Sequence, residues 1–293
     1  DSVELAVVPP VWIEDLFVRP DWRTGRLDFE VSLQNATTSN SPAQLEVSVA
    51  HASVGGTLAC CRQTALCQPG NSQTSLSLEV PNHRLWQLND PALYRVTARV
   101  QVTGQETFHE QSVRTGFRDF RFERGNFRLN GRRIFLRSSH TGNCCPIGLE
   151  LPADPDWLRR DLLLVKTMGF NMIRFISGVA KRSQLDLCDE LGLMVYEESY
   201  AGWCLANSSQ MAARYDESVL GMVRRDRNYP SVVIWGLLNE TPDGPVFRHA
   251  VGFLPKLRQL DETRLVLLNS GGWHQGPDRL LAGMQVQRRE TGP

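Results

Sequence analysis

Hydrophobic and polar residues alternate with a period of two along the first 116 residues. The stretch "LDFEVSLQN" places Leu27, Phe29, Val31 and Leu33 on one side of the chain, which is the pattern of a half-buried strand. "AQLEVSVAH", "TSLSLEVP" and "LYRVTARVQV" repeat it between turns rich in Gly, Pro, Asn and Ser. Short strands at this spacing predict an immunoglobulin-like β-sandwich over residues 1–116, with a barrel as the alternative. Because no titratable groups gather here, we expect a structural or docking domain.

After a bridging segment the pattern changes, and strands alternate with helices. Strands are predicted in "RRIFLRSS", "FNMIRFIS", "LMVYEES", "SVVIWGLL" and "RLVLLNS". Helices are predicted in "DPDWLRRDLLLVKTMG", "SQLDLCDELG", "MAARYDESVLGMVRRDRNYP" and near residues 245–260, with Asp154 as an N-cap and Gly169 and Gly192 as stops. Apolar strands that alternate with helices predict a parallel sheet covered on both faces.

A doubly wound sheet and a (β/α)₈ barrel both fit this alternation, and the strand ends distinguish them. No GxGxxG or GxxxxGK[ST] motif follows a strand, so no phosphate-binding loop is predicted. Polar residues instead end the successive strands: Arg137 to His140, Arg174 and Ser177, Glu197 and Glu198, Asn239 and Glu240, and Asn269. Barrel enzymes build their sites at that face. Five of the eight strands of a barrel are visible, so residues 117–293 are predicted to be the N-terminal part of a TIM barrel, giving a multidomain β plus α/β fold.

The stretch "SVVIWGLLNETPDGP" ends its apolar strand on Asn239 and Glu240. A carboxyl group partly desolvated by a barrel wall has a raised pKa, which suits a general acid. An amide offers a donor and an acceptor, which suits a ligand rich in hydroxyl groups. The alternative is that Glu240 pairs with Arg174 or caps the next helix, and spacing alone favours neither.

Composition excludes some classes of function. The 293 residues are 41% hydrophobic and 22% charged, with 32 basic residues balancing 32 acidic ones, so no net charge attracts nucleic acid or a membrane surface. No apolar run approaches the roughly 20 residues of a membrane span, so we expect a soluble protein. The start, "DSVELAVVPPVW", shows no signal peptide, which leaves the compartment open between cytoplasmic and secreted or periplasmic.

The seven cysteines include two adjacent pairs and no CxxC spacing, so neither a zinc site nor another cofactor is predicted. Cys60 or Cys61 could bridge to Cys67 in an oxidising compartment, but we expect free thiols. A divalent metal ion at the barrel mouth is not indicated by the sequence and stays open.

Four stretches resemble successive blocks of glycoside hydrolase family 2, which includes β-galactosidases, β-glucuronidases and β-mannosidases. They are "GFRDFRFERGNFRLNGRRIFLR", "LLLVKTMGFNMIRF", "LDLCDELGLMVYEES" and "MVRRDRNYPSVVIWGLLNE". "HRLWQLNDPALYRVTARV" is similar to the late strands of that family's immunoglobulin-like domain. The blocks occur in family order from about residue 10 to 270. The resemblance implies a retaining β-glycosidase with a carbohydrate substrate.

The resemblance also implies roles for individual residues. Glu240 matches the acid/base that protonates the leaving glycosidic oxygen, and Asn239 matches the residue that binds the sugar 2-hydroxyl. Arg174 matches an arginine beneath the catalytic carboxylates, where its charge helps to keep a nearby nucleophile ionised.

Three further residues are assigned to substrate binding. Glu198 matches an acid at the barrel mouth that joins a metal or hydrogen-bond network in some members, with an ion pair as the alternative. Trp235 lies in the same block as Glu240. His140 matches only weakly, and a hydrogen-bonding role within its loop is the favoured alternative. Ser177 stands where many members have histidine, and Arg137-Ser138 replaces Arg-Gly, so the identity of the sugar stays open.

No residue of the chain matches the nucleophile. In this family that glutamate lies on the seventh barrel strand, and the chain ends soon after the fifth. Glu290 lies on no predicted strand, and Glu197 and Glu198 match the third-strand block. We therefore expect a chain that stops before the nucleophile and is inactive alone. The alternative is a non-catalytic carbohydrate-binding or docking relative, and a homo-oligomer formed through exposed strand edges stays open.

Overall fold

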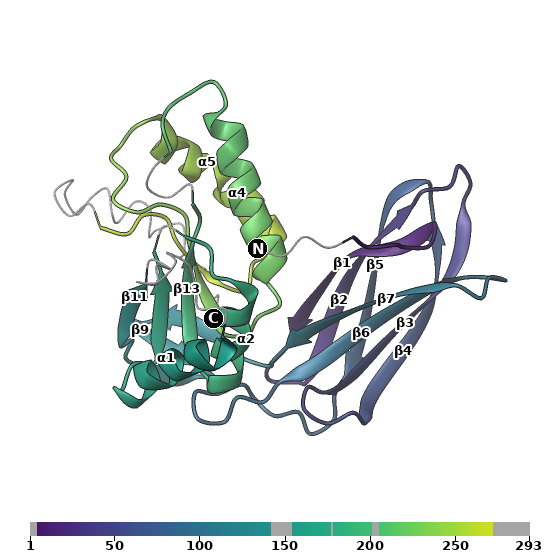
Figure 1. Cartoon of the computed structure of the whole chain (residues 1–293), viewed down its shortest axis with the longest axis horizontal. Coiled ribbons are helices and arrows are strands. Elements are labelled where there is room, and N and C mark those ends of the chain that lie inside the picture. The colour runs from purple at the N-terminus through teal and green to yellow at the C-terminus, as the bar shows by residue number, and fades with distance from the viewer. Residues whose placement is uncertain (1–4, 142–153, 177, 201–204, 272–293) are drawn as a thin grey trace. The chain divides into compact units, whose positions relative to one another are not determined.

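The computed structural model describes residues 5–141, 154–176, 178–200 and 205–271 (Figure 1). The chain forms two compact units. The first comprises residues 1–86 and 92–118, and the second comprises residues 87–91 and 119–293. The short segment 87–91 therefore belongs with the second unit, although the sequence on both sides of it belongs with the first.

The first unit is a sandwich of two antiparallel sheets, as the alternation predicts. One sheet has the order β1-β2-β5, and the other has the order β4-β3-β6-β7. The strands are β1 Val11–Pro20, β2 Arg26–Asn35, β3 Ser41–His51, β4 Thr57–Cys67, β5 Gly70–Glu79, β6 Tyr94–Val102 and β7 Phe108–Thr115. The inward-facing residues of β2 are almost fully buried, so the period-two pattern marks the core correctly: Leu27, Phe29, Val31 and Leu33.

The cysteines of the sandwich are free thiols, as expected. Cys60, Cys61 and Cys67 all lie on the single strand β4. A strand rises about 3.3 Å per residue, so Cys61 and Cys67 are roughly 20 Å apart along it. That separation is far beyond the reach of a disulfide, which needs Cα atoms within about 7 Å.

The second unit contains a small antiparallel sheet and a larger parallel one. The small sheet has the order β10-β9-β8, with β8 Phe120–Glu123, β9 Asn126–Leu129 and β10 Arg132–Ile134. The parallel sheet has five strands in sequence order: β11 Ser138–Thr141, β12 Met172–Phe175, β13 Met194–Glu198, β14 Val232–Gly236 and β15 Leu265–Leu267. This is the partial TIM-barrel arrangement that the alternation predicts.

In the described parts of the chain, the helices between the parallel strands are α1 Pro155–Thr167, α2 Arg182–Leu191, α4 Met211–Asp226 and α5 Pro245–Leu260. The predicted signals act as expected. The Asp154 side chain accepts from the Asp156 N–H at 2.9 Å, which caps the start of α1. Gly192 ends α2 in the left-handed conformation, φ 68°, which glycine adopts at little cost.

The end of α2 also holds the segment 87–91. The Lys166 Nζ donates to the carbonyl oxygens of Leu191 and Leu88. A Cβ on Gly192 would collide with the backbone of Leu88, so glycine permits the close approach as well as the helix end. Lys166 and Gly192 thus hold residues 87–91 against the second unit.

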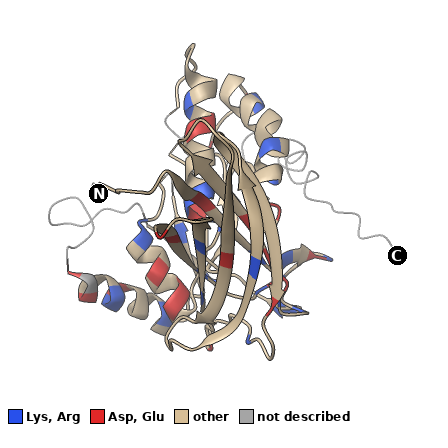
Figure 2. Ribbon diagram, turned by 90° about the vertical axis from the view of Figure 1, so that its right-hand side faces the viewer, with Lys and Arg blue, Asp and Glu red and all other residues tan. Residues whose placement is uncertain are grey.

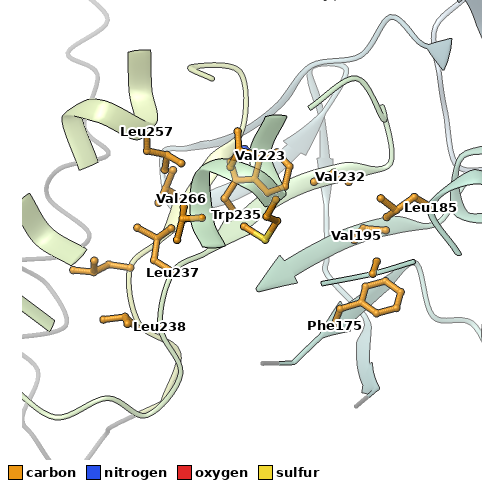
Figure 3. Close-up of a cluster of buried hydrophobic side chains, with 14 of the residues drawn as sticks. Phe175, Leu185, Val195, Val223, Val232, Trp235, Leu237, Leu238, Leu257 and Val266 are labelled. Atoms are coloured by element: carbon orange, nitrogen blue, oxygen red, sulfur yellow. The ribbon is translucent and has the colours of Figure 1, made fainter. Parts of the chain in front are cut away.

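The core of the second unit lies between the parallel sheet and its helices (Figure 3). Trp235 is fully buried there, and its indole N–H donates to Asp261 Oδ2 at 2.8 Å. The structure therefore places the Trp235 side chain in the core, whereas the sequence analysis expects it to contact a substrate. Successive residues of a strand face opposite sides, and it is the neighbouring Gly236 that lies against Tyr196 and Glu198 on the inner side of the sheet.

Acidic and basic residues are interspersed along the helices and strands (Figure 2). None of the helices in the described parts of the chain is both long enough and apolar enough to cross a membrane.

Candidate active site

The candidate site lies where β12, β13, β14 and β15 end. Parallel pairing places Arg174 beside Tyr196, and Glu198 beside Gly236. Past the regular strands, a single bridge joins Asn239 to Ser270. Residues from four strands, almost a hundred positions apart in sequence, are thereby brought to one face of the sheet.

Arg174 is the centre of this site. Its Nε donates to Glu198 Oε1 at 2.8 Å, and its Nη2 donates to Asn239 Oδ1 at 2.7 Å and to Ser270 Oγ at 2.6 Å. Glu198 is fully buried, and Nη2 also lies 2.6 Å from its Oε1. Hydrogen bonds between a guanidinium and a carboxylate are stronger than those between neutral groups, so this contact fixes both side chains. The sequence correctly groups Arg174 with Asn239, and Glu198 is held in an ion pair, the alternative left open for it.

Ser270 is a site residue that sequence reasoning missed. Its hydroxyl accepts from Arg174 and lies 2.8 Å from Asn239 Oδ1, 3.2 Å from Glu198 Oε1 and 3.4 Å from the Leu238 carbonyl oxygen. The signal available was the polar pair that ends the fifth predicted strand. That signal indicated Asn269, the neighbour, as the strand-end residue.

Asn269, which follows β15, instead contacts the turn after β14. The Thr241 N–H donates to Asn269 Oδ1 at 3.2 Å, and Asn269 Nδ2 donates to the Thr241 carbonyl oxygen at 3.1 Å. The two residues therefore fix the start of the loop that follows Glu240.

Tyr196 lies on the same side of the sheet as Arg174, whose guanidinium stands 5.1 Å from the centre of the tyrosine ring. Burial, and secondly the nearby Glu198 charge, raises the pKa of the Tyr196 hydroxyl well above its ordinary value. The side chain is therefore a neutral phenol at any ordinary pH, and its uncharged ring packs against the Arg174 guanidinium.

Glu240 follows Asn239 in an unusual backbone conformation. Its φ is 51°, in the left-handed region that non-glycine residues seldom adopt, and its N–H donates to the Ser270 carbonyl oxygen at 2.7 Å. Residues held this way cluster at active sites. Among the described residues no ion pair joins Glu240 to Arg174, and the N-cap of α5 is Gly244 without a side-chain cap, so neither structural alternative holds.

The expected partial desolvation of Glu240 is wrong for this sheet, because its side chain is exposed. Among the described residues, the five strands of the parallel sheet lie in the order β11-β12-β13-β14-β15, with β14, which leads to Glu240, between β13 and β15. Gly271 is its near neighbour, with a position for a Cβ only 2.8 Å from Glu240 Cγ.

Glu197, adjacent to Glu198, faces the helices instead. It is fully buried and accepts from the Ala180 N–H at 2.8 Å, with Arg225 Nη2 at 3.7 Å. Burial and then the neighbouring Asp226 charge raise the pKa of Glu197 well above its ordinary value, and Arg225 opposes this only in part. Two adjacent glutamates are thus divided between the site and the structural core.

The contacts of the remaining candidate residues do not assign them a role. His140 is exposed on β11 and pairs in register with Arg174, so it stands at the edge of the site without a role assigned by contacts. Ser177, Cys144, Cys145 and Glu290 lie outside the described residues. Within the described part of the chain, no three or more His, Cys, Asp or Glu residues are grouped so that they could hold a metal ion.

Comparison with known proteins identifies a family for both units. Residues 11–118 match the family model for glycosyl hydrolases family 2, and residues 120–290 match the model for the TIM barrel domain of glycosyl hydrolases family 2. A β-galactosidase from Aeromonas hydrophila is 28% identical over 311 aligned positions, covering 100% of this chain and 29% of that protein. One from Yersinia enterocolitica is 28% identical over 229, covering 75% of this chain and 21% of that protein.

Solved structures show the same relationship. The β-glucuronidase of Bacteroides uniformis has a TM-score of 0.74 and 25% identity, over 88% of this chain and 34% of that one. A glycosyl hydrolase family 2 member from Bacteroides cellulosilyticus has a TM-score of 0.80 at 24% identity, over 90% of this chain and 35% of that one. The chain thus spans about a third or less of the length of these relatives. Both units match in family order, and the chain belongs to glycosyl hydrolases family 2.

Proposed function

We propose that this chain carries the acid/base side of a retaining β-glycosidase site. Glu240 is the proton donor, and Asn239 binds the sugar hydroxyl next to the reacting carbon. The observation that carries the proposal is the pair itself: an exposed carboxyl beside a buried amide whose oxygen is already held by Arg174. The amide then has N–H groups to offer a ligand, and the carboxyl is accessible to a glycosidic oxygen.

The proposed reaction has two steps. In the first, a second carboxylate attacks the anomeric carbon while the bond to the leaving oxygen breaks and Glu240 gives that oxygen its proton. In the second, Glu240 takes a proton from water, which attacks the anomeric carbon and releases the carboxylate. Glu240 ends protonated again, so the cycle closes.

We propose that the second carboxylate comes from a part of the barrel beyond these five strands. A retaining enzyme needs its two carboxyl groups about 5 Å apart and both free to react. Glu198 is fully buried and engaged with Arg174, and Glu197 is buried on the other side of the sheet. The 293-residue chain alone is therefore expected to hydrolyse glycosides slowly or not at all.

The first measurement is the intact mass of the protein from its native source, compared with 33.0 kDa. A larger native protein would then be assayed with aryl β-glycosides of graded leaving groups. Glu240→Gln should slow a phenyl glycoside about 10²- to 10⁴-fold, the usual contribution of a general acid. A dinitrophenyl glycoside should suffer much less in its first step, because that leaving group needs no proton. Equal losses for both would refute the acid role.

The second candidate is a carbohydrate-binding protein without hydrolysis. Glu197 and Glu198 are both buried and engaged in contacts, whereas Glu240 is exposed. Among these three acids only Glu240 is accessible, and hydrolysis with retention needs two carboxyl groups. A native mass of 33.0 kDa, with saturable binding of glycosides and no turnover, would support it. Turnover that disappears in Glu240→Gln would exclude it.

A further inference from the structure

We propose that Ser270 is a positioning residue that, with Arg174, fixes the amide plane of Asn239 so that its Nδ2 is presented to a ligand hydroxyl. The proposal rests on the function proposed above for Asn239, and adds the residue on which that function depends. Ser270 lies just past the end of β15, and the proposal gives it no direct contact with the sugar.

The chemistry of the donors fixes which end of the amide faces inward. Arg174 can only donate, and its Nη2 lies 2.7 Å from Asn239 Oδ1. The Ser270 hydroxyl lies 2.8 Å from the same oxygen and 2.6 Å from the same Nη2. Because the hydroxyl accepts from Arg174, its single proton is free for Asn239 Oδ1, which at 2.8 Å is nearer than Glu198 Oε1 at 3.2 Å or the Leu238 carbonyl oxygen at 3.4 Å. The reversed amide would place N–H groups against a guanidinium.

Arg174 alone selects the amide end, but one donor leaves the amide free to swing about that bond. Ser270 supplies the second donor and closes a triangle of Arg174, Asn239 and Ser270. Asn239 is 4% exposed and Ser270 is 8% exposed, so water is a poor substitute for the hydroxyl. Among the described residues no acceptor is bonded to Asn239 Nδ2, which leaves that group for a ligand.

The backbone of Ser270 makes two hydrogen bonds of its own, to the residues on either side of Asn239. Its N–H donates to the Leu238 carbonyl oxygen at 3.0 Å, and its carbonyl oxygen accepts from the Glu240 N–H at 2.7 Å. Replacement by alanine keeps both bonds and removes only the hydroxyl. Ser270→Ala therefore tests the side chain without dismantling the strand end.

Ser231→Ala is a matched control. Like Ser270, Ser231 is buried in the second unit, and its Oγ has no hydrogen-bond partner among the described residues. Both variants lose one buried hydroxyl, so a general effect of that loss appears in both. Ser270→Thr keeps the hydroxyl and serves as the rescue.

The first test uses the whole chain and needs no catalysis. The side-chain amide cross-peaks of Asn239 in a ¹H–¹⁵N spectrum are identified by their loss in Asn239→Ala. Ser270→Ala should displace them, whereas Ser231→Ala should leave them in place and Ser270→Thr should restore them. Unchanged cross-peaks in Ser270→Ala would overturn the proposal, as would equal displacement in the control.

The second test uses the native enzyme on a β-glycoside and its 2-deoxy analogue. Ser270→Ala should lower kcat/KM for the glycoside about ten-fold, the cost of one hydrogen bond, and leave the analogue nearly unchanged. Ser270→Ala with Asn239→Ala should be no slower than Asn239→Ala alone. Equal losses on both substrates would refute positioning. Hydrolysis that survives Glu240→Gln would refute the proposed function instead, while the spectrum still decides the role of Ser270.

Discussion

The two units of this chain differ in how many polar and charged residues they bury. In the described part of the sandwich the buried polar or charged residues are Asn35, Thr115 and Arg118. In the described part of the second unit they are Asn171, Gln184, Asp189, Glu197, Glu198, Ser199, Asp226, Arg227, Ser231, Asn239, Asp261, Arg264 and Ser270. A buried polar group is costly unless it is paired, so a fold keeps many of them only where they are needed. In the second unit only Glu198, Asn239 and Ser270 of these belong to the candidate site, and others, such as Glu197 and Asp261, make buried contacts in the core.

The largest expected effect contrasts an ion pair from each unit. Arg174→Met leaves Glu198 buried without its counter-charge, which should lower the free energy of unfolding of the second unit by about 3–5 kcal/mol. Arg62→Met removes a pair from the sandwich surface, where Arg62 is 67% exposed, and should cost less than about 1 kcal/mol. Urea denaturation of both variants measures this. If both variants lost a similar free energy of unfolding, the ion pairs of the two units would not differ as we expect.

A smaller effect comes from pH. The pKa of Glu197 is raised in the folded protein, so the folded state binds more protons than the unfolded state above the ordinary value of 4.5. The stability that Glu197 contributes is thus complete at lower pH and is lost as pH rises from 4.5 toward its folded pKa, by at most about 1.4 kcal/mol per pH unit.

Glu197→Gln should flatten this decline, because an amide does not ionise. Unfolding free energies in urea, measured at intervals from pH 4.5 to 8, compare the variant with the native chain. Glu46→Gln on the sandwich surface is the control and should keep the native slope. If Glu197→Gln retained the native slope as well, the buried acid would not be its source.

The smallest effect compares two left-handed glycines. Gly271 has φ 78° and Gly70 has φ 82°, so alanine at either should cost about 1–2 kcal/mol in backbone strain. Only at Gly271 would the new Cβ press on Glu240, whereas nothing lies within 4 Å at Gly70. Gly271→Ala should therefore also move the Glu240 carboxyl, visible in a crystal structure. A Glu240 that stays in place would show that the site tolerates the methyl group.

The sequence predicts the elements and their order because those follow from periodicity, caps and glycine stops. It also predicts that Arg174, Asn239 and Glu240 lie at strand ends. It does not predict which way a side chain faces on a strand buried on both sides, because such a strand has no alternation to set the phase. The pattern therefore does not show that Trp235 faces the core, and past the end of β15 it does not show which of Asn269 and Ser270 turns toward Arg174. The exposure of Glu240 depends on how many strands surround it, which no local pattern records.

The segment 87–91, fastened to the second unit by Lys166 and Gly192, has a consequence for how this protein can be divided. The backbone passes from one unit to the other three times, so no single cut separates them. A piece starting at residue 119 would lose the Leu88 carbonyl that Lys166 binds, and a piece ending at residue 118 would carry a loop with nothing to bind it. We therefore expect the two units to be transferred together when genes are fused, and not one without the other.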